Sequence, residues 1–238
     1  MGQDGSDNWC SNIYYKPVRV KNATGDGVWS DWVSVSTGEM YTCGIRVDGS
    51  LWCWGENWDG QLGTGSNQDM SLYLPTRVAD GTLWSYVEAG DYHTCGIQKN
   101  GTLWCWGSGG EGRLGDDMFV THRTPTQVGT ETDWVELSLG ESFSCGLRSD
   151  GTVWCFGAGG SGKLGNGMDT PVGHPVLVGL DEYQTNRGWT DIGGGRYHGC
   201  GIRETFEEGG VQHRLFCWGE SGDGRLGYGG DESQYYPE

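Results

Sequence analysis

Short apolar segments of five or six residues recur along the chain, separated by runs rich in glycine and polar residues. Segments such as Leu51-Trp52-Cys53-Trp54 are apolar at successive positions, so both faces of the strand they predict carry apolar side chains. That pattern is typical of a sheet covered on both sides, not of one with a face in water. The pattern therefore predicts small antiparallel sheets stacked against one another.

The stretch 81–130 illustrates the predicted unit. Lys99-Asn100-Gly101 suits a three-residue hairpin loop, because glycine adopts the left-handed backbone conformation such a loop needs. The strands predicted around this loop are Trp84–Glu88, His93–Gln98, Thr102–Trp106 and Pro125–Val128.

The same unit is written four times. Each copy has a tryptophan, a Cys-Gly pair eleven positions later, an aromatic-Cys-aromatic-Gly box and a glycine-rich loop ending in Leu-Gly. The boundaries are 29–80, 81–130, 131–180 and 181–238, the last incomplete, after a partial repeat at 1–28. A period near fifty residues indicates a repeat architecture, and four-stranded sheets stacked radially form a propeller. The prediction is one all-β domain, a β-propeller of about four blades.

Composition narrows the classes of partner. The formal net charge is −17, which disfavours nucleic acid and anionic membranes because both are bound through lysine and arginine. No run of about 18 apolar residues predicts a membrane span. The first residues lack the basic start and apolar stretch of a signal peptide, so either a leader has been removed or the protein is intracellular.

The nine cysteines favour a removed leader. Eight of them fall opposite one another across the predicted hairpins, as Cys43 and Cys53, Cys95 and Cys105, Cys145 and Cys155, and Cys200 and Cys217. We expect four cross-strand disulfides; buried free thiols are the alternative, and a two-cysteine hairpin supplies only half of a zinc site. Cys10 is left free or bridges to another chain. An even set of cysteines suits an oxidising compartment, so the predicted location is secreted or at the cell surface.

Several motifs resemble the regulator-of-chromosome-condensation repeat family. They are the Gly-x-x-aromatic turns that end in Tyr41, His93, Phe143 and His198, the Asp-Gly hairpins, the aromatic-Gly boxes and the loop Gly60-Gln61-Leu62-Gly63. The resemblance implies a β-propeller. It leaves the function open, since the family includes a GTPase exchange factor, a plant UV-B photoreceptor and a secreted β-lactamase inhibitor. The cysteine-containing repeat looks like the secreted variants.

This chain departs from the best-known members, which have seven blades. Its repeats begin and end at the glycine loop, so the last strand of the fourth blade is expected from the other end of the sequence, at Pro17, Val18, Arg19 and Val20. Three explanations stay open. The N-terminal strand closes a four-bladed ring in cis, or it pairs with another molecule and builds a head-to-tail assembly, or the chain is a portion of a longer propeller.

No catalytic constellation, metal site or cofactor motif is predicted. His93 and His198 occupy equivalent repeat positions, where the other copies have Tyr41 and Phe143, which indicates packing. Acidic pairs such as Asp116-Asp117 lack the alternating oxygen ligands of a calcium loop. The photoreceptor hypothesis is disfavoured because the boxes before His93 and His198 lack tryptophan.

Binding is therefore expected at surface segments whose sequence differs between the four repeats. The candidates are Trp58 and the N-terminal Trp9, Tyr14 and Tyr15, with packing on their own blade as the alternative. Asn22 and Asn100 begin glycosylation sequons. The preferred function is a non-enzymatic extracellular or cell-surface propeller that contacts protein or glycan, with self-assembly by strand exchange as one form of such contact. The alternatives are a GTPase exchange factor and a glycan-binding lectin.

Overall fold

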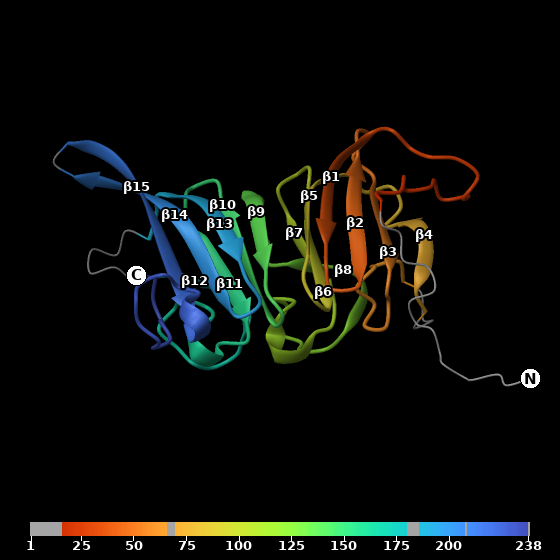
Figure 1. Ribbon diagram of the computed structural model, residues 1–238. Coiled ribbons are helices and arrows are strands. Elements are labelled where there is room, and N and C mark those ends of the chain that lie inside the picture. Colours follow the sequence, from red (N-terminus) through yellow and green to blue (C-terminus); the bar gives the residue numbers. More distant parts are fainter. Residues whose placement is uncertain (1–15, 66–69, 180–185, 208, 238) are drawn as a thin grey trace, which may run out of the picture.

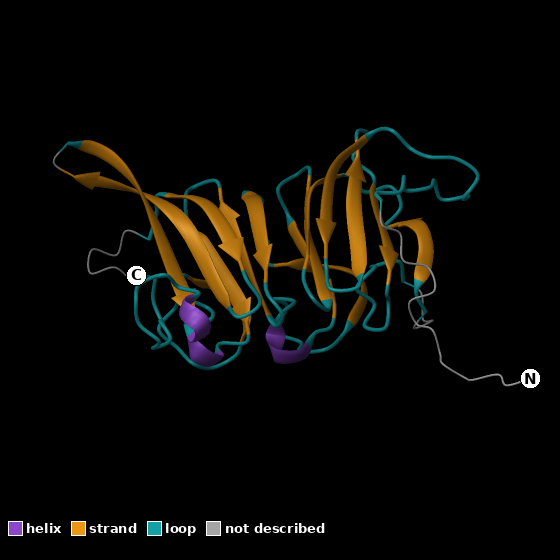
Figure 2. Cartoon of the chain, viewed as in Figure 1, coloured by secondary structure: helices purple, strands orange, loops and turns teal. Residues whose placement is uncertain are grey.

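The computed structural model describes residues 16–65, 70–179, 186–207 and 209–237. Within these ranges the chain is built from strands, with three short 3-10 turns in the glycine-rich loops, as Figure 2 shows. The all-β prediction is confirmed.

The strands form four antiparallel sheets, each made of strands consecutive in sequence. The first sheet contains β1 (Trp32–Thr37), β2 (Tyr41–Arg46), β3 (Leu51–Gly55) and β4 (Leu72–Arg77). The second contains β5 (Trp84–Ala89), β6 (His93–Gln98), β7 (Leu103–Gly107) and β8 (His122–Val128). The third contains β9 (Trp134–Leu139), β10 (Phe143–Arg148), β11 (Val153–Gly157) and β12 (Val172–Leu177). The fourth contains β13 (Trp189–Gly194), β14 (His198–Glu207) and β15 (Gly210–Gly219).

Each sheet is centred on a hairpin whose register places two cysteines directly opposite each other. Cys95 on β6 faces Cys105 on β7, and the same pairing recurs between β2 and β3, β10 and β11, and β14 and β15. All four pairs form disulfides, between the partners that the sequence predicted. Three of the bonds join residues ten positions apart, and the fourth joins residues seventeen positions apart.

A side-chain relay fixes the tight hairpin loops. Asn100 Oδ1 accepts hydrogen bonds from the backbone N–H and the hydroxyl of Thr102, and the hydroxyl accepts one from Trp104 Nε1 at 2.8 Å. Asp48 and Asp150 hold the equivalent loops in the same way. This relay explains why Asp or Asn precedes glycine in three of the four copies.

The sheets stand side by side as propeller blades. Figure 1 shows them in chain order along an open arc, with the first sheet at one end and the fourth at the other. The hairpin tip of each blade bonds to the next, since the carbonyls of Gly49, Gly101 and Gly151 accept from the backbone N–H of Trp84, Trp134 and Trp189. Those three tryptophans are buried between blades.

Closure of the ring in cis by Pro17–Val20, one of the three explanations left open by the sequence, is not formed in this structure. Among the described residues the fourth sheet has three strands, and Pro17–Val20 belongs to no sheet and is exposed. The position where the fourth strand should start is taken by Gln234, which pairs with Gly219 through two backbone hydrogen bonds of 2.7 and 2.9 Å. This bridge has the register of His122 opposite Gly107. Val20 instead lines a hollow on the first blade together with Trp32 and Trp54.

Candidate functional site

The first strand of every blade lines the concave side of the arc. Strand β1 contacts β5, β5 contacts β9, and β9 contacts β13. Polar side chains alternate along these strands and bond between blades: the hydroxyl of Ser36 donates to Glu88 Oε2 at 3.3 Å and accepts from the backbone N–H of Ala89. The inner wall is therefore a polar surface to which all four blades contribute.

Four charged residues gather at one end of this wall. Each follows the glycine of the turn between the first two strands of its blade: Glu39, Asp91, Glu141 and Arg196. The guanidinium of Arg196 lies 2.7 Å from Glu141 Oε1 and 3.2 Å from Asp91 Oδ2, so it ties the fourth blade to the second and third. The turns surround a hollow of about 380 Å³, which we call the axial hollow.

The axial hollow is acidic. Its lining includes the carboxylates of Glu39, Glu88 and Asp91, and Arg196 is the basic side chain among the lining residues. Burial raises the pKa of Glu88 and the pKa of Asp91, although the charge of Arg196 partly opposes the second shift. Partial burial strengthens the field that these carboxylates present to a cation entering the hollow.

A second acidic pair lies further along the wall. Glu136 on β9 stands beside Asp191 on β13, with Glu88 on β5 also facing it. Burial, followed by the charge of Asp191 and a hydrogen bond between the two carboxyls, raises the pKa of Glu136 to about 7. The pair therefore shares a proton below neutral pH and becomes two repelling carboxylates above it.

Replacing Glu136 with glutamine is expected to flatten the pH dependence of stability. The folded pKa of Glu136 lies above its ordinary value of 4.5, so the wild-type chain loses stability as pH rises from about 4.5 through about 7. Glutamine can donate to Asp191 at every pH. We expect Glu136→Gln to exceed the wild type by about 1 kcal/mol at pH 8, allowing for solvent screening, and to approach it near pH 5.

Chemical denaturation at pH 5 and pH 8 measures this difference. Burial lowers the pKa of His93 to about 3, so the contribution of His93 to folding stability rises with pH over an overlapping range. The effect of Glu136 is therefore obtained only from the difference in stability between the variant and the wild type. Glu111→Gln, at an exposed loop position, is the matched control and should leave the profile unchanged. An equal gain at both pH values would contradict the shared-proton interpretation.

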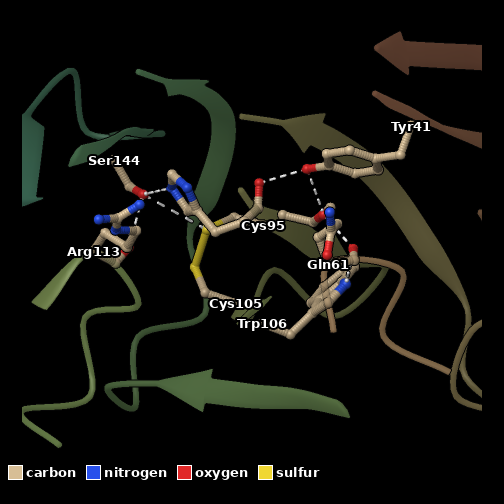
Figure 3. The surroundings of a disulfide bond; sticks show 9 residues. Tyr41, Gln61, Cys95, Cys105, Trp106, Arg113 and Ser144 are labelled. Atoms are coloured by element: carbon tan, nitrogen blue, oxygen red, sulfur yellow. Dashed lines mark hydrogen bonds between the residues drawn. A yellow bond between two sulfur atoms is a disulfide. The ribbon is translucent and has the colours of Figure 1, made fainter. Parts of the chain in front are cut away.

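A buried polar network joins the blades behind this wall. Figure 3 shows Ser144 beside the disulfide of Cys95 and Cys105. The Ser144 hydroxyl donates to the carbonyl of Arg113 at 2.9 Å and lies 2.8 Å from His93 Nε2. A histidine beside a serine resembles a base and nucleophile, but His93 is 0% and Ser144 1% exposed, so no substrate reaches them. The contact holds the second and third blades together.

The other half of the network joins the first two blades. Tyr41 donates its hydroxyl proton to the carbonyl of His93 at 2.6 Å. The carbonyl of Gln61, in the glycine-rich loop, accepts from Thr94 at 2.7 Å and from Trp106 Nε1 at 2.9 Å. The loop that ends in Leu-Gly is therefore a blade-to-blade connector, which explains its recurrence in every copy.

The structure places only some of the predicted site residues. Trp58 is 63% exposed, and Asn100 lies exposed at its hairpin tip, whereas Asn22 is half-buried and bonded to Asp26. Cys10, Trp9, Tyr14 and Tyr15 lie outside the described residues. Sequence reasoning missed the axial residues Glu39, Asp91, Glu141 and Arg196. The available signal was a charged residue after the repeated glycine in every copy.

Neither a group of three or more His, Cys, Asp or Glu side chains placed to hold a metal ion, nor a helix long and apolar enough to cross a membrane, occurs in the part of the chain that the structure describes.

The fold and the repeated turns define a protein of the β-propeller repeat class. The family model of the Regulator of chromosome condensation (RCC1) repeat matches residues 48–97, 100–147 and 150–202, more than half of the sequence. The chain belongs to this family.

Relatives are similar over parts of their length. The mitochondrial RCC1 domain-containing protein RUG3 of Arabidopsis thaliana is 34% identical over 82 residues, which are 34% of this chain and 18% of that protein. The ultraviolet-B receptor UVR8 of the same plant is 28% identical over 115 residues, which are 48% of this chain and 25% of the receptor. The chain thus aligns with a quarter or less of these relatives.

Solved structures show the same fold. Human WBSCR16 superposes with a TM-score of 0.73 at 23% identity, covering 90% of this chain and 53% of that one. Prp20p from Saccharomyces cerevisiae, described with its binding properties to Gsp1p and histones, superposes with a TM-score of 0.72 at 16% identity, covering 92% and 55%. The chain therefore corresponds to about half of each of these propellers.

Proposed function

We propose that this chain is a non-enzymatic interaction propeller that acts outside the cell or at its surface and binds a protein partner at the axial hollow. The proposal rests on one observation. Glu39 of the first blade and Glu88 and Asp91 of the second line a common hollow, and Arg196 of the fourth blade pairs with Asp91 beside it. Turns held on a rigid repeat scaffold are favourable binding positions because their geometry is set before the partner arrives.

The charge of the hollow defines the partner's chemistry. The carboxylates of Glu39, Glu88 and Asp91 line the hollow. The guanidinium of Arg196 is already paired with Asp91 and Glu141, so the surface of the hollow stays acidic. A lysine or arginine side chain projecting from a protein partner complements this surface. The net charge of −17 adds long-range attraction for such a partner at low salt.

Four disulfides support an extracellular or cell-surface location. Disulfides form and persist in oxidising compartments and are rare in the cytosol. The exposed position of Asn100 at a hairpin tip is compatible with glycosylation in such a compartment.

The exchange-factor hypothesis rests on family membership. Prp20p is described with Gsp1p binding, but this chain aligns with 55% of it at 16% identity, which supports the fold alone. The four disulfides also disfavour a reducing compartment. The lectin hypothesis rests on one exposed aromatic side chain, that of Trp58.

Exchange of the strand Pro17–Val20 between copies is another route to self-association, in which that exposed segment would extend the fourth sheet of a neighbour. Gln234 already occupies the first pairing position beside Gly219, so such a strand would add beyond it or displace it.

Binding of an oligolysine peptide tests the axial hollow. Calorimetry at low salt should detect binding to the wild type, and the double variant Glu39→Gln, Glu88→Gln should bind about tenfold more weakly, a loss of about 1.4 kcal/mol. Glu111→Gln, which removes an exposed carboxylate elsewhere, should bind like the wild type. Equal weakening by both variants would mean that only net charge attracts the peptide and would contradict the proposal.

A further inference from the structure

Successive blades pack through one repeated pair of faces. The back face of the first blade, with Ile45, Leu51 and Leu62, is buried against Trp84, Val87 and Trp106 on the front face of the second. The next junction buries Ile97, Leu103 and Leu114 against Trp134, Leu137 and Phe156. The third buries Leu147, Val153 and Leu164 against Trp189, Ile192 and Trp218. The described part of the chain thus contains three copies of one interface.

Backbone groups repeat across the same junctions. Trp106 Nε1 donates to the carbonyl of Gln61 at 2.9 Å, and Trp218 Nε1 donates to the carbonyl of Lys163 at 3.1 Å. These two carbonyls belong to the residue before Leu62 and Leu164, in the connector loops. The repeated interface therefore combines apolar packing with a fixed hydrogen bond, and both specify one register.

In the described part of the chain no blade covers the front face of the first blade, whose hollow is lined at its edge by Val20. Val35 is 67% exposed, whereas Val87, its equivalent in the second blade, is 2% exposed. Trp32 and Trp54 are half-buried and line an apolar hollow of about 400 Å³ together with Val35. The equivalents of these tryptophans, Trp84 and Trp106, are fully buried by the blade before them.

Among the described residues, no blade stands against the back face of the fourth blade either. Leu215 is 68% exposed, whereas Leu51 and Leu103 at the same position are 0% exposed. Gly227 has no atom within 4 Å of an added Cβ, whereas at Gly63 the same Cβ would lie 2.5 Å from Trp106 Nε1. The fourth blade has the interface residues of the others, without a blade against them.

The long hairpin of β14 and β15 enlarges this face. Ile202 pairs with Leu215 and Phe206 pairs with Val211, and alternation along a strand places all four on the same side. Phe206 is 84% and Val211 47% exposed. The same alternation places the polar pair Glu204 and His213 between these two apolar pairs. Exposed apolar side chains gathered on one face are typical of an interaction surface.

We propose that the back face of the fourth blade binds the front face of the first blade of a second copy of this chain, in the register that joins successive blades. Leu215, Ile202 and Leu226 of one copy then cover Trp32, Val35 and Trp54 of the next. Trp54 Nε1 donates to the carbonyl of Arg225, which precedes Leu226 as Gln61 precedes Leu62. The contact is heterologous, so copies add head to tail.

A second copy is the favoured occupant because the chain itself shows what each face accepts. At each of the three internal junctions, an Ile/Leu/Val face packs against an aromatic face in the same register. The exposed face of the fourth blade is of the first kind, and the exposed face of the first blade is of the second kind. This proposal differs from strand exchange, because no strand leaves its own sheet. It is also independent of the axial hollow, so either can fail without the other.

Two substitutions with matched exposure test the interface. Val35→Arg damages the front face and Leu215→Arg the back face, at side chains 67% and 68% exposed, so neither should disturb folding. Light scattering after size exclusion, up to about 100 µM protein, should show wild-type oligomers and monomeric variants, with association weakened at least about 100-fold. Added arginines reduce the net charge, so repulsion does not explain a loss.

Mixing the two variants gives the decisive result. The intact front face of Leu215→Arg can bind the intact back face of Val35→Arg, so a one-to-one pair should form that grows no further. Val33→Arg, on the same strand at a position 62% exposed and outside the internal junctions, should assemble like the wild type. A monomeric wild type, or a mixture that stays monomeric, would overturn the proposal.

Discussion

Reduction of the four disulfides is expected to lower the melting temperature of this chain by about 20 °C or more. Each bond closes a loop of ten to seventeen residues and should contribute about 2–3 kcal/mol by restricting the unfolded chain. Together the bonds account for a contribution comparable to the whole stability of an ordinary domain. Thermal unfolding with and without reductant, followed by circular dichroism, measures the effect.

Thiol counting and one variant complete this experiment. Of nine cysteines, eight are in disulfides, so the oxidised, unfolded chain should show one free thiol, from Cys10, and the reduced chain nine. Cys95→Ala with Cys105→Ala should lower stability by about 2–3 kcal/mol, and reductant should then have a smaller effect. A melting temperature unchanged by complete reduction would show that the stacked blades alone hold the fold.

Gly63→Ala is expected to destabilise the chain by about 2–4 kcal/mol. Gly63 has a φ of +68°, and an added Cβ would lie 2.5 Å from Nε1 of the fully buried Trp106. The backbone conformation accounts for about 1 kcal/mol, and displacement of the buried indole for the rest. Urea unfolding of the monomeric chain measures the difference.

Gly227→Ala is the matched control for that substitution. It occupies the same repeat position with a φ of +74°, but nothing lies within 4 Å of the added Cβ. We expect a cost of about 1 kcal/mol, from the backbone conformation alone. Equal costs at the two glycines would show that strain within the loop, and not packing of the next blade, explains why glycine recurs there.

The strands were predictable because their signals are local. The prediction of His93–Gln98 matches β6, and Trp84–Glu88 ends one residue before β5 does. The last strand was predicted three residues late, at Pro125, because proline was taken as its start, whereas β8 begins at His122. Cysteine pairing was predictable for the same reason, since the loop length alone places Cys95 opposite Cys105.

The axial hollow was not predictable from the repeat. Glu39, Asp91 and Arg196 are separated by about fifty residues or more in sequence, and only the stacking of blades brings their turns together. The same limit explains why the sequence left ring closure open. Complementary strand sequences at the two ends indicate that pairing is chemically possible, but the angle between blades decides whether the ends meet.

The sequence by itself therefore determined the repeat, the antiparallel hairpins, the disulfides and the family, because each depends on residues within one unit of about fifty. Only the tertiary structure decided that the described blades form an open arc, that Gln234 bridges to Gly219 at the edge of the last blade, and that Leu215 is exposed where Leu51 is buried. The physical reason is that burial belongs to a pair of surfaces: an identical side chain is core or interface according to whether another blade stands beside it.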